Sequence, residues 1–371
     1  MGVIFLETNS SQPEFDKPFS DYEHQLTKLK RRGIYFPDSE KTNVLSLIKQ
    51  HGYYQLINGY ADAFEISNQS HEKSYANGTE FNDVFAQFYF DRTLGNLLFR
   101  YLLNVEENFT NLLSYEVAKK FGVNNYYGSD LLNQFPSVMS YLDMRRYTNS
   151  NTSSLTKLHN LSLNCQKDPT KWYRENCNHI PPWILLMNAE LGITINYFKI
   201  LPFDIKKEII SNLIPPVLQY EQYEEYECSR RSRRSGRDYS ELDIQSGYSH
   251  LFVNGLNLMR EFRNCIAHNN RLYKFRSKFT VSSLIRNIPR STTIYSTEEY
   301  YNGIGKNDLF SLLIWIIICQ PNKAINLLFI DSLHSTLESF KEADPSNSFF
   351  VGSELPGDYY NRLKEYINDI R

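Results

Sequence analysis

The residues best suited to chemistry lie in one stretch, Arg260 to Arg271, which contains Arg-Asn-x-x-x-His at Arg263, Asn264 and His268. In this composition, chance predicts about 0.4 matches to Arg-x-x-x-x-His, and about 0.04 once Asn must follow the Arg. An imidazole can accept or donate a proton near neutral pH, and a guanidinium can bind two phosphate oxygens as charge develops. These residue types suit RNA cleavage by attack of a ribose 2′-OH on the adjacent phosphate.

A second arginine and histidine have the same spacing. Arg174 and His179 are also five positions apart, but Glu175 follows the arginine where the first pattern has asparagine, and Pro181 comes soon after the histidine. The fuller pattern is the more informative one. We therefore interpret the Arg174 and His179 spacing as a coincidence.

The motif lies in a segment whose periodicity predicts a helix over residues 249–270. Each helical residue turns its side chain by about 100°, which places Arg260, Asn264, His268 and Arg271 on one face. We expect this face to meet solvent, the alternative being a histidine satisfied within the core. The opposite face carries the apolar residues Leu258, Met259, Phe262, Cys265 and Ile266.

Arg263 is the exception within the motif, because it lies about 140° around a regular helix from His268. Three arrangements would bring the two together: the long arginine stem wraps around the helix, the helix loosens, or the helix of a second protomer completes the pocket. Asn264 is expected to orient the imidazole from one turn below.

The sequence gives no sign of a metal or another cofactor. Its five cysteines are widely spaced, and no Cys/His/carboxylate cluster has metal-ligand spacing. The proposed attack needs no metal ion. Unpaired cysteines and the lack of a secretory leader predict a cytoplasmic protein. The apolar run Leu309–Cys319 is roughly half as long as a membrane-spanning helix, so we expect a buried helix and no membrane contact.

Charge is balanced over the chain as a whole. The formal net charge is −2, so any contact with a polyanion must be local. The one strongly basic segment is predicted to be a loop that either contacts RNA phosphates or is simply solvated. It contains Arg230, Arg231, Arg233, Arg234 and Arg237.

Hydrophobic residues make up 41% of the chain, which is enough for a globular core. Apolar residues recur at three- and four-residue steps and not in strand alternation, so the predicted class is all-α. Ser39 is the expected N-cap of the second helix. Residues 149–164 read as a loop or a weak helix. The predicted helices cover residues 21–33, 40–51, 81–121, 183–201, 249–270, 309–328 and 358–370.

The pattern from Arg263 to His268 resembles the signature of HEPN ribonucleases. A longer part of the chain, from about Asp21 to Tyr273, is similar to the abortive-infection (Abi-like) proteins of bacterial phage defence. The landmarks of this second resemblance are Arg32-Gly33, His51-Gly52-Tyr53-Tyr54, Gly59-Tyr60, Phe90-Asp91-Arg92-x-Leu94, Val105-Glu106, Pro182-Trp183, Gly192 and Ala267-His268-x-x-Arg271-Leu272.

These resemblances imply a HEPN-like helical bundle. We expect an N-terminal helical extension over residues 1–80, a core that carries the motif over 81–280, and a C-terminal helical extension over 281–371. RNA as substrate, a homodimer that brings two motifs together, and growth arrest or cell death during phage infection are implied as well. Some relatives look to be controlled by a small RNA.

The resemblance also bears on two acidic residues of the long helix. In HEPN-like folds this helix packs near the motif, so Glu106 is a candidate to orient Arg263, with an ordinary flanking carboxylate as the alternative. Asp91, beside Arg92, is interpreted as part of a local ion pair or cap, with a chemical role as the alternative.

Three positions depart from the Abi-like pattern. Gln55 stands where the family often has arginine, Met187 where it often has an acidic residue, and Asn269 where it often has a second histidine. The last departure removes an auxiliary base and leaves Arg263 and His268 in place.

Three functions therefore compete. The first is a metal-independent endoribonuclease toxin of an abortive-infection system. The second is an RNA-binding module that does not cleave, in which the same residues hold phosphate and a small RNA holds the protein. The third is an interaction protein whose helical surface pairs with a partner.

Overall fold

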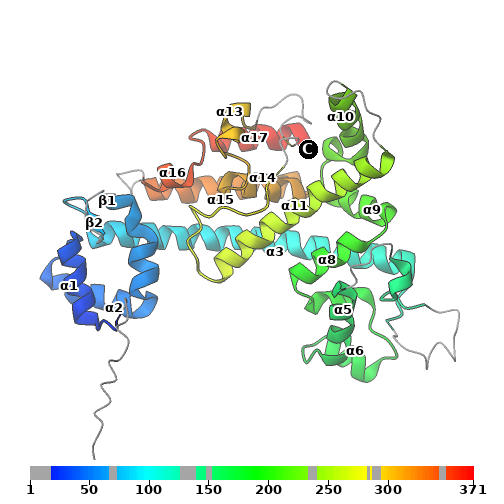
Figure 1. Cartoon of the computed structure of the whole chain (residues 1–371), viewed down its shortest axis with the longest axis horizontal. Helices are drawn as coiled ribbons and strands as arrows, with labels where there is room; N and C mark the ends of the chain where they lie inside the picture. Colours follow the sequence, from blue (N-terminus) through cyan, green and yellow to red (C-terminus); the bar gives the residue numbers. More distant parts are fainter. Residues whose placement is uncertain are drawn as a thin grey trace, which may run out of the picture. The chain divides into compact units, whose positions relative to one another are not determined.

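The computed structural model describes residues 18–66, 73–125, 139–147, 153–232, 240–281, 285, 294–341 and 348–371. Within these residues the helices and strands are all helical elements apart from one pair of two-residue strands, as Figure 1 shows. The predicted all-α class is confirmed. The chain divides into two compact units, Met1–Phe88 and Tyr89–Arg371.

The first unit holds two α-helices and a short antiparallel ladder. Asp21 caps the first helix by accepting a hydrogen bond from the His24 backbone, and Gly33, with a φ of 101°, ends it. A Cβ at position 33 would lie 2.9 Å from the Tyr75 carbonyl oxygen, so only glycine fits this approach. The elements are α1 (Tyr22–Arg32), η1 (Asp38–Glu40), α2 (Lys41–His51), η2 (Tyr54–Asn58), η3 (Ala61–Phe64), β1 (Glu65–Ile66) and β2 (Ser74–Tyr75).

The predicted cap at Ser39 is wrong. The chain enters α2 through the 3-10 turn η1, and the residue that precedes the helix is Glu40, whose side chain makes no capping hydrogen bond. Ser39 lies inside that turn. A turn that is already hydrogen-bonded supplies partners for the first amides of the helix, so no serine cap is required.

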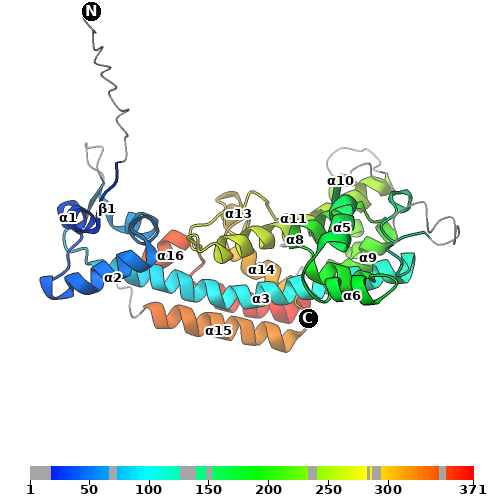
Figure 2. The same cartoon turned by 90° about the horizontal axis from the view of Figure 1, so that it is seen from below.

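The second unit is built on α3, which begins at Phe81 in the first unit and ends at Phe121, at the bounds predicted from its periodicity. α15 (Lys323–Lys341) runs beside it and α11 (Glu241–Ala267) crosses it (Figures 1 and 2). The other described elements of this unit are α5 (Ser153–Asn164), α6 (Thr170–Asn176), α7 (Pro182–Leu185), α8 (Leu191–Ile200), α9 (Phe203–Leu213), α10 (Tyr220–Ser232), α13 (Thr297–Tyr301), α14 (Leu309–Cys319), α16 (Ser348–Ser353) and α17 (Tyr359–Ile370), with 3-10 turns η4 (Met144–Arg146), η5 (Leu186–Asn188) and η6 (Pro216–Leu218).

Aromatic side chains join these helices where they cross. Phe109 of α3, Phe198 of α8 and Phe252 of α11 form a triangle with ring centroids 5.5–6.2 Å apart. Such edge and tilted contacts add to the free energy of burying the rings. On another side of α3, Phe90 stacks on Phe340 of α15 with centroids 3.7 Å apart. Burial of these large rings fixes α3, α8, α11 and α15 relative to one another.

The predicted helix over residues 183–201 is wrong as one element. The chain forms α7, then η5, then two extended residues, Ala189 and Glu190, before α8 begins. The Asn188 side chain donates to the Thr170 hydroxyl at 2.9 Å and lies 3.3 Å from the Asp168 carbonyl. An asparagine bonded outside its own helix competes with helix continuation, which accounts for the break.

Three further predictions can be compared with the structure. Residues Ser153–Asn164 form the helix α5, so the weak-helix alternative for this segment is confirmed. The predicted helix over residues 309–328 is wrong as one element: α14 ends at Cys319 and α15 begins at Lys323, because Pro321 lies between them and does not fit a helix interior. Every residue of α14 is buried, as expected for its apolar run. Among the described helices, none is both long and apolar enough to cross a bilayer.

Candidate functional site

The motif lies at the C-terminal end of α11. This helix begins at Glu241 rather than at the predicted residue 249, and Ser240 is its N-cap, whose hydroxyl accepts a hydrogen bond from the Asp243 backbone. Its apolar stripe is confirmed at Leu258, Met259, Phe262 and Cys265, which are all buried, while the fifth predicted member, Ile266, is half-buried. α11 therefore holds its motif face outward because the other face is fixed in the core.

The helix ends within the motif. His268 is the C-cap, and Asn269 follows with a φ of 56°. The Asn269 amide donates to the Ile266 carbonyl at 2.9 Å, and the Asn270 amide donates to the Cys265 carbonyl at 2.9 Å. This pair of hydrogen bonds is the Schellman motif, which satisfies the last carbonyls of a helix. Asparagine is one of the few residues besides glycine that adopt this left-handed conformation easily, so Asn269 has a structural role here.

His268 is exposed, as expected from its position on the helix. Within the described residues its imidazole makes no hydrogen bond and no ion pair. Asn264 is also exposed, and its side-chain oxygen accepts from Arg263 Nη1 at 3.2 Å. The predicted contact in which Asn264 would orient the imidazole is not present among the described contacts. The His268 ring is thus open to a ligand and is positioned by the backbone turn.

Arg263 points toward α3. Its Nε lies 3.5 Å from Oε2 of Glu106, as the resemblance implied. The two atoms are buried and make no hydrogen bond with each other or with any other described group. Burial raises the pKa of Glu106, and the charge of Arg263 offsets that rise only in part. Glu106 therefore holds Arg263 by charge attraction alone, which leaves guanidinium donors available for an anion.

Within one chain, Arg263 and His268 are not joined. No hydrogen bond links their side chains among the described residues, and Arg263 is directed to the α3 side of α11 while His268 caps the helix. Of the three arrangements considered, the regular helix up to Ala267 excludes loosening before the cap. A substrate phosphate would have to bridge the two groups, or a second copy would have to supply one of them.

Asp91 of α3 anchors the chain that follows the motif. Its two carboxylate oxygens accept hydrogen bonds from the backbone amides of Leu272 and Tyr273, at 2.8 and 2.9 Å, and the side chain is buried. Sequence reasoning considered only a local ion pair, a cap or chemistry for this residue. The available signal was an aspartate on the core side of an amphipathic helix, which requires buried donors.

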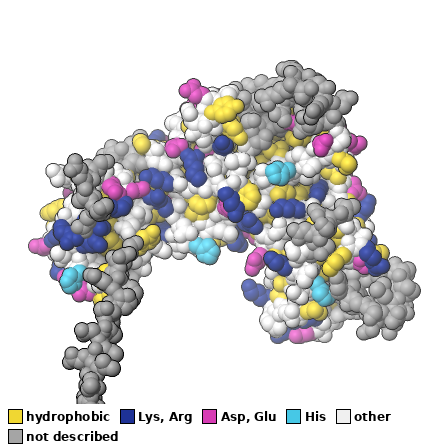
Figure 3. All heavy atoms as spheres, viewed as in Figure 1, with side chains coloured by type: hydrophobic (Ala, Val, Ile, Leu, Met, Phe, Trp, Pro, Cys, Tyr) yellow, Lys and Arg dark blue, Asp and Glu magenta, His cyan; other side chains and the backbone are white. Residues whose placement is uncertain are grey.

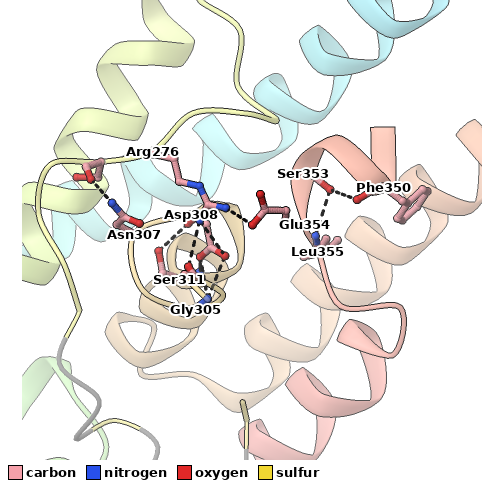
Figure 4. A network of polar contacts seen from close by, with 11 residues as sticks. Arg276, Gly305, Asn307, Asp308, Ser311, Phe350, Ser353, Glu354 and Leu355 are labelled. Carbon is pink, nitrogen blue, oxygen red and sulfur yellow. Dashed lines mark hydrogen bonds and ion pairs between the residues drawn. The ribbon is translucent and has the colours of Figure 1, made fainter. Parts of the chain in front are cut away.

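A second buried carboxylate, that of Asp308, helps to hold the segment that follows the motif. Figure 4 shows Arg276 between Asp308, 3.5 Å away, and Glu354. Asp308 is the N-cap of α14 and accepts from the amides of Ser311 at 2.9 Å and Gly305 at 3.0 Å. Burial raises the pKa of Asp308, and these hydrogen bonds oppose that rise. Asp91 and Arg276 together fix the segment that leaves the motif.

Arg260 lies two turns before His268, against α8. A Cβ on Gly192 would approach its Nη1 to 2.9 Å, so the guanidinium rests on the bare backbone of that glycine. Arg260 has no acidic partner among the described residues. Burial lowers the pKa of Lys199 in α8, and the positive charge of Arg260 lowers it further. The two cations form a local positive site with no carboxylate to neutralise it.

Arg271 belongs to the connection after the helix. Its guanidinium lies over the Tyr273 ring, 5.7 Å from the centroid, and its carbonyl accepts from the Cys265 thiol at 3.4 Å. Burial raises the pKa of Cys265 to about 12, so this thiol inside the motif stays protonated. Cys265 packs the helix end and does not provide a nucleophile.

The basic segment lies largely outside the described residues. The backbone at Arg230 and Arg231 continues α10, so the predicted loop does not begin at residue 230. The remaining members, Arg233, Arg234 and Arg237, lie outside the described chain. Elsewhere, basic and acidic side chains are interspersed over the face drawn in Figure 3. Within the described chain, no three His, Cys, Asp or Glu side chains come together as a metal-ligand set.

One comparison with known proteins gives a match. A family model described as "Abi-like protein" matches residues 46–274, a range that includes α3, α11 and the whole motif. No curated protein and no solved structure matches the chain.

Proposed function

Because the chain belongs to the Abi-like protein family, we propose that it is an endoribonuclease toxin of an abortive-infection system that cleaves RNA without a metal ion. The observation that carries the proposal is the exposed imidazole of His268, which has no partner in the described chain. One turn earlier, Arg263 is held by a carboxylate that leaves some of its donors open. Abortive infection is suggested by the family, and the RNA chemistry by these two side chains.

In the proposed reaction, His268 accepts the proton of a ribose 2′-OH, and the 2′-oxygen forms a bond to the adjacent phosphorus. The bond from phosphorus to the 5′-oxygen breaks, and that oxygen takes a proton from an imidazolium, supplied by His268 of a second copy. The products are a 2′,3′-cyclic phosphate and a 5′-hydroxyl. Arg263 binds the phosphate oxygens as negative charge accumulates on them. A homodimer is part of the proposal because one chain provides a single motif histidine.

The test is RNA cleavage by purified protein in EDTA. We expect wild type to give cyclic-phosphate ends, and His268→Ala and Arg263→Ala to lose activity by about 100-fold or more. His250→Ala is the matched control, because His250 is an exposed histidine on the same helix, and it should cleave normally. Cleavage that requires a metal ion, or that survives in His268→Ala, would contradict the proposal.

A second candidate is an RNA-binding module that does not cleave. The observation that favours it is the orientation of Arg263 toward Glu106, with no described contact to His268. In that case gel shifts appear without products, and the same substitutions abolish the shift. A growth test separates the two: if the protein is a nuclease toxin, expression of wild type arrests the host and expression of His268→Ala does not.

A further inference from the structure

A hollow on the second unit lies away from the motif. It is formed where α5 and α6 lie side by side and by the chain that follows α6 (Figures 1 and 2). Its volume is about 210 Å³, small compared with typical ligand pockets of roughly 300–1,000 Å³. We refer to it as the α5–α6 hollow; its lining residues are Asn125, His159, Ser162, Leu163, Arg174, Cys177, Asn178, His179 and Ile180.

The ionisable side chains of the lining include bases and no carboxylates among the described residues. Arg174 and His179, whose spacing was interpreted as a coincidence, both line this hollow, and His159 lines it from α5. None of the described lining residues is an aspartate or glutamate. The described lining therefore combines one guanidinium and two imidazoles with no carboxylate, a composition that favours an anion.

The positions of these groups are fixed by hydrogen bonds. Arg174 Nη1 donates to the Ser162 carbonyl at 3.3 Å, which ties α6 to α5. The Ile180 amide donates to Asn125 Oδ1 at 2.7 Å, and the Ile180 carbonyl accepts from the Tyr141 hydroxyl at 2.9 Å. The hollow is thus built before a ligand arrives, which reduces the entropy lost on binding.

The two imidazoles differ in what they can donate. His179 Nδ1 lies 2.7 Å from Asn178 Oδ1, and because that oxygen can only accept, Nδ1 carries the hydrogen. Nε2 of His179 then donates to a ligand only when the ring is protonated. Burial lowers the pKa of His159, so this ring favours its neutral form in the absence of a ligand. The guanidinium of Arg174 offers only donors to a ligand.

A metal ion is the less suitable occupant. His159, Cys177 and His179 line the same hollow, yet these three do not form a metal-ligand set among the described residues. The Arg174 charge would also repel a cation. An oxyanion, in contrast, can accept hydrogen bonds from the guanidinium and from both rings.

We propose that the α5–α6 hollow binds a phosphate monoester. Arg174, His159 and His179 contact the phosphate oxygens, and the apolar side chains of Leu163 and Ile180 contact the organic part. The shared chemistry is a terminal phosphate, carried either by a free nucleotide or by the 5′ end of an RNA. This site is separate from the motif and does not depend on RNA cleavage.

The binding test uses calorimetry on the full chain at about pH 6, near the ordinary pKa of histidine. The probes are adenosine 5′-monophosphate, adenosine, and a trinucleotide with either a 5′-phosphate or a 5′-hydroxyl. We expect the monophosphate to bind and adenosine to fail. A phosphorylated trinucleotide that binds more tightly than the monophosphate would identify RNA ends as the source.

The variants are His179→Gln and Arg174→Gln, and each should weaken the binding of the monophosphate by about tenfold or more. His179→Gln is less expected to disturb folding, because Arg174 also donates a hydrogen bond to the backbone of α5. An unchanged melting temperature shows that each variant is folded. His250→Gln and His268→Ala are controls and should bind as wild type. The proposal is overturned if adenosine binds as tightly as its monophosphate, if neither probe binds, or if His179→Gln has wild-type affinity. Loss of binding in His268→Ala would assign the ligand to the motif instead.

Discussion

The guanidinium of Arg263 lies against the carboxylate of Glu106, with Nε and Oε2 3.5 Å apart and no hydrogen bond between them. This pair crosses from α11 to α3 and connects the motif to the longest helix of the chain. Because this pair contains no hydrogen bond, binding of a phosphate by Arg263 would break none with Glu106.

The Glu106 pair predicts a pH effect on stability. Burial raises the pKa of Glu106 above its unfolded value, so the folded state favours the protonated form, and stability is lost as pH rises through the folded pKa. Glu106→Gln has no such loss. We expect equal melting temperatures below about pH 4, and a higher one for the variant at pH 7. Glu107→Gln, at the exposed neighbouring position, is the control; a variant that melts below wild type at pH 7 would contradict the assignment.

Removal of the Asp91 carboxylate should destabilise the second unit. Asp91→Ala leaves the buried amides of Leu272 and Tyr273 without acceptors, which costs about 2–4 kcal/mol. Urea unfolding measures this loss. Asp204→Asn, which breaks only an exposed pair with Lys120, should cost about 1 kcal/mol or less. Equal effects of the two substitutions would show that Asp91 is not an anchor.

The left-handed turn at Asn269 predicts which substitutions this position tolerates. Asn269→Gly keeps the left-handed turn and should leave the melting temperature nearly unchanged. Asn269→Val places a β-branched side chain at a φ of 56° and should cost about 1–2 kcal/mol. The variant should also lose RNA cleavage, because the turn positions His268. Thermal melts of the two variants, run beside a cleavage assay, test both expectations; a stable, active valine variant would exclude this role.

Arg260 is predicted to contact the phosphate backbone. Arg260→Gln should weaken RNA binding about equally for all sequences and reduce the slope of log affinity against log salt by about one. Gly192→Ala should have a similar effect with little change in stability, since its Cβ displaces the flexible end of Arg260. Fluorescence anisotropy at several salt concentrations gives the slope. An unchanged slope in both variants would place RNA elsewhere.

The sequence was sufficient for the elements that are dominated by periodicity. The bounds of α3, the apolar stripe of α11 and the exposure of His268 all follow from three- and four-residue spacing, because local burial decides them. Two errors arose where hydrogen bonds outside the helical pattern decide the structure. Asn188 interrupts the predicted helix over residues 183–201, and the turn η1 replaces the expected cap at Ser39.

The surroundings of the motif were less predictable. The contact between Glu106 and Arg263 came from a family resemblance and not from the residue pattern. Asp91 contacts Leu272 and Tyr273, which follow it by 181 and 182 residues, and no local signal specifies such a pairing. The α5–α6 hollow was missed because the spacing of Arg174 and His179 lacked the asparagine of the motif, and only the fold brings His159 beside them.

Asp91 and Glu106 stand on the same uninterrupted helix, about 22 Å apart along its axis. Asp91 binds the segment that follows the motif, and Glu106 faces Arg263 of the motif. The helix α3 therefore fixes the angle between these two contacts around its axis. Inserting a single residue between them would swing one contact by about 100° relative to the other. Length changes in this stretch should therefore be far more damaging than most substitutions within it.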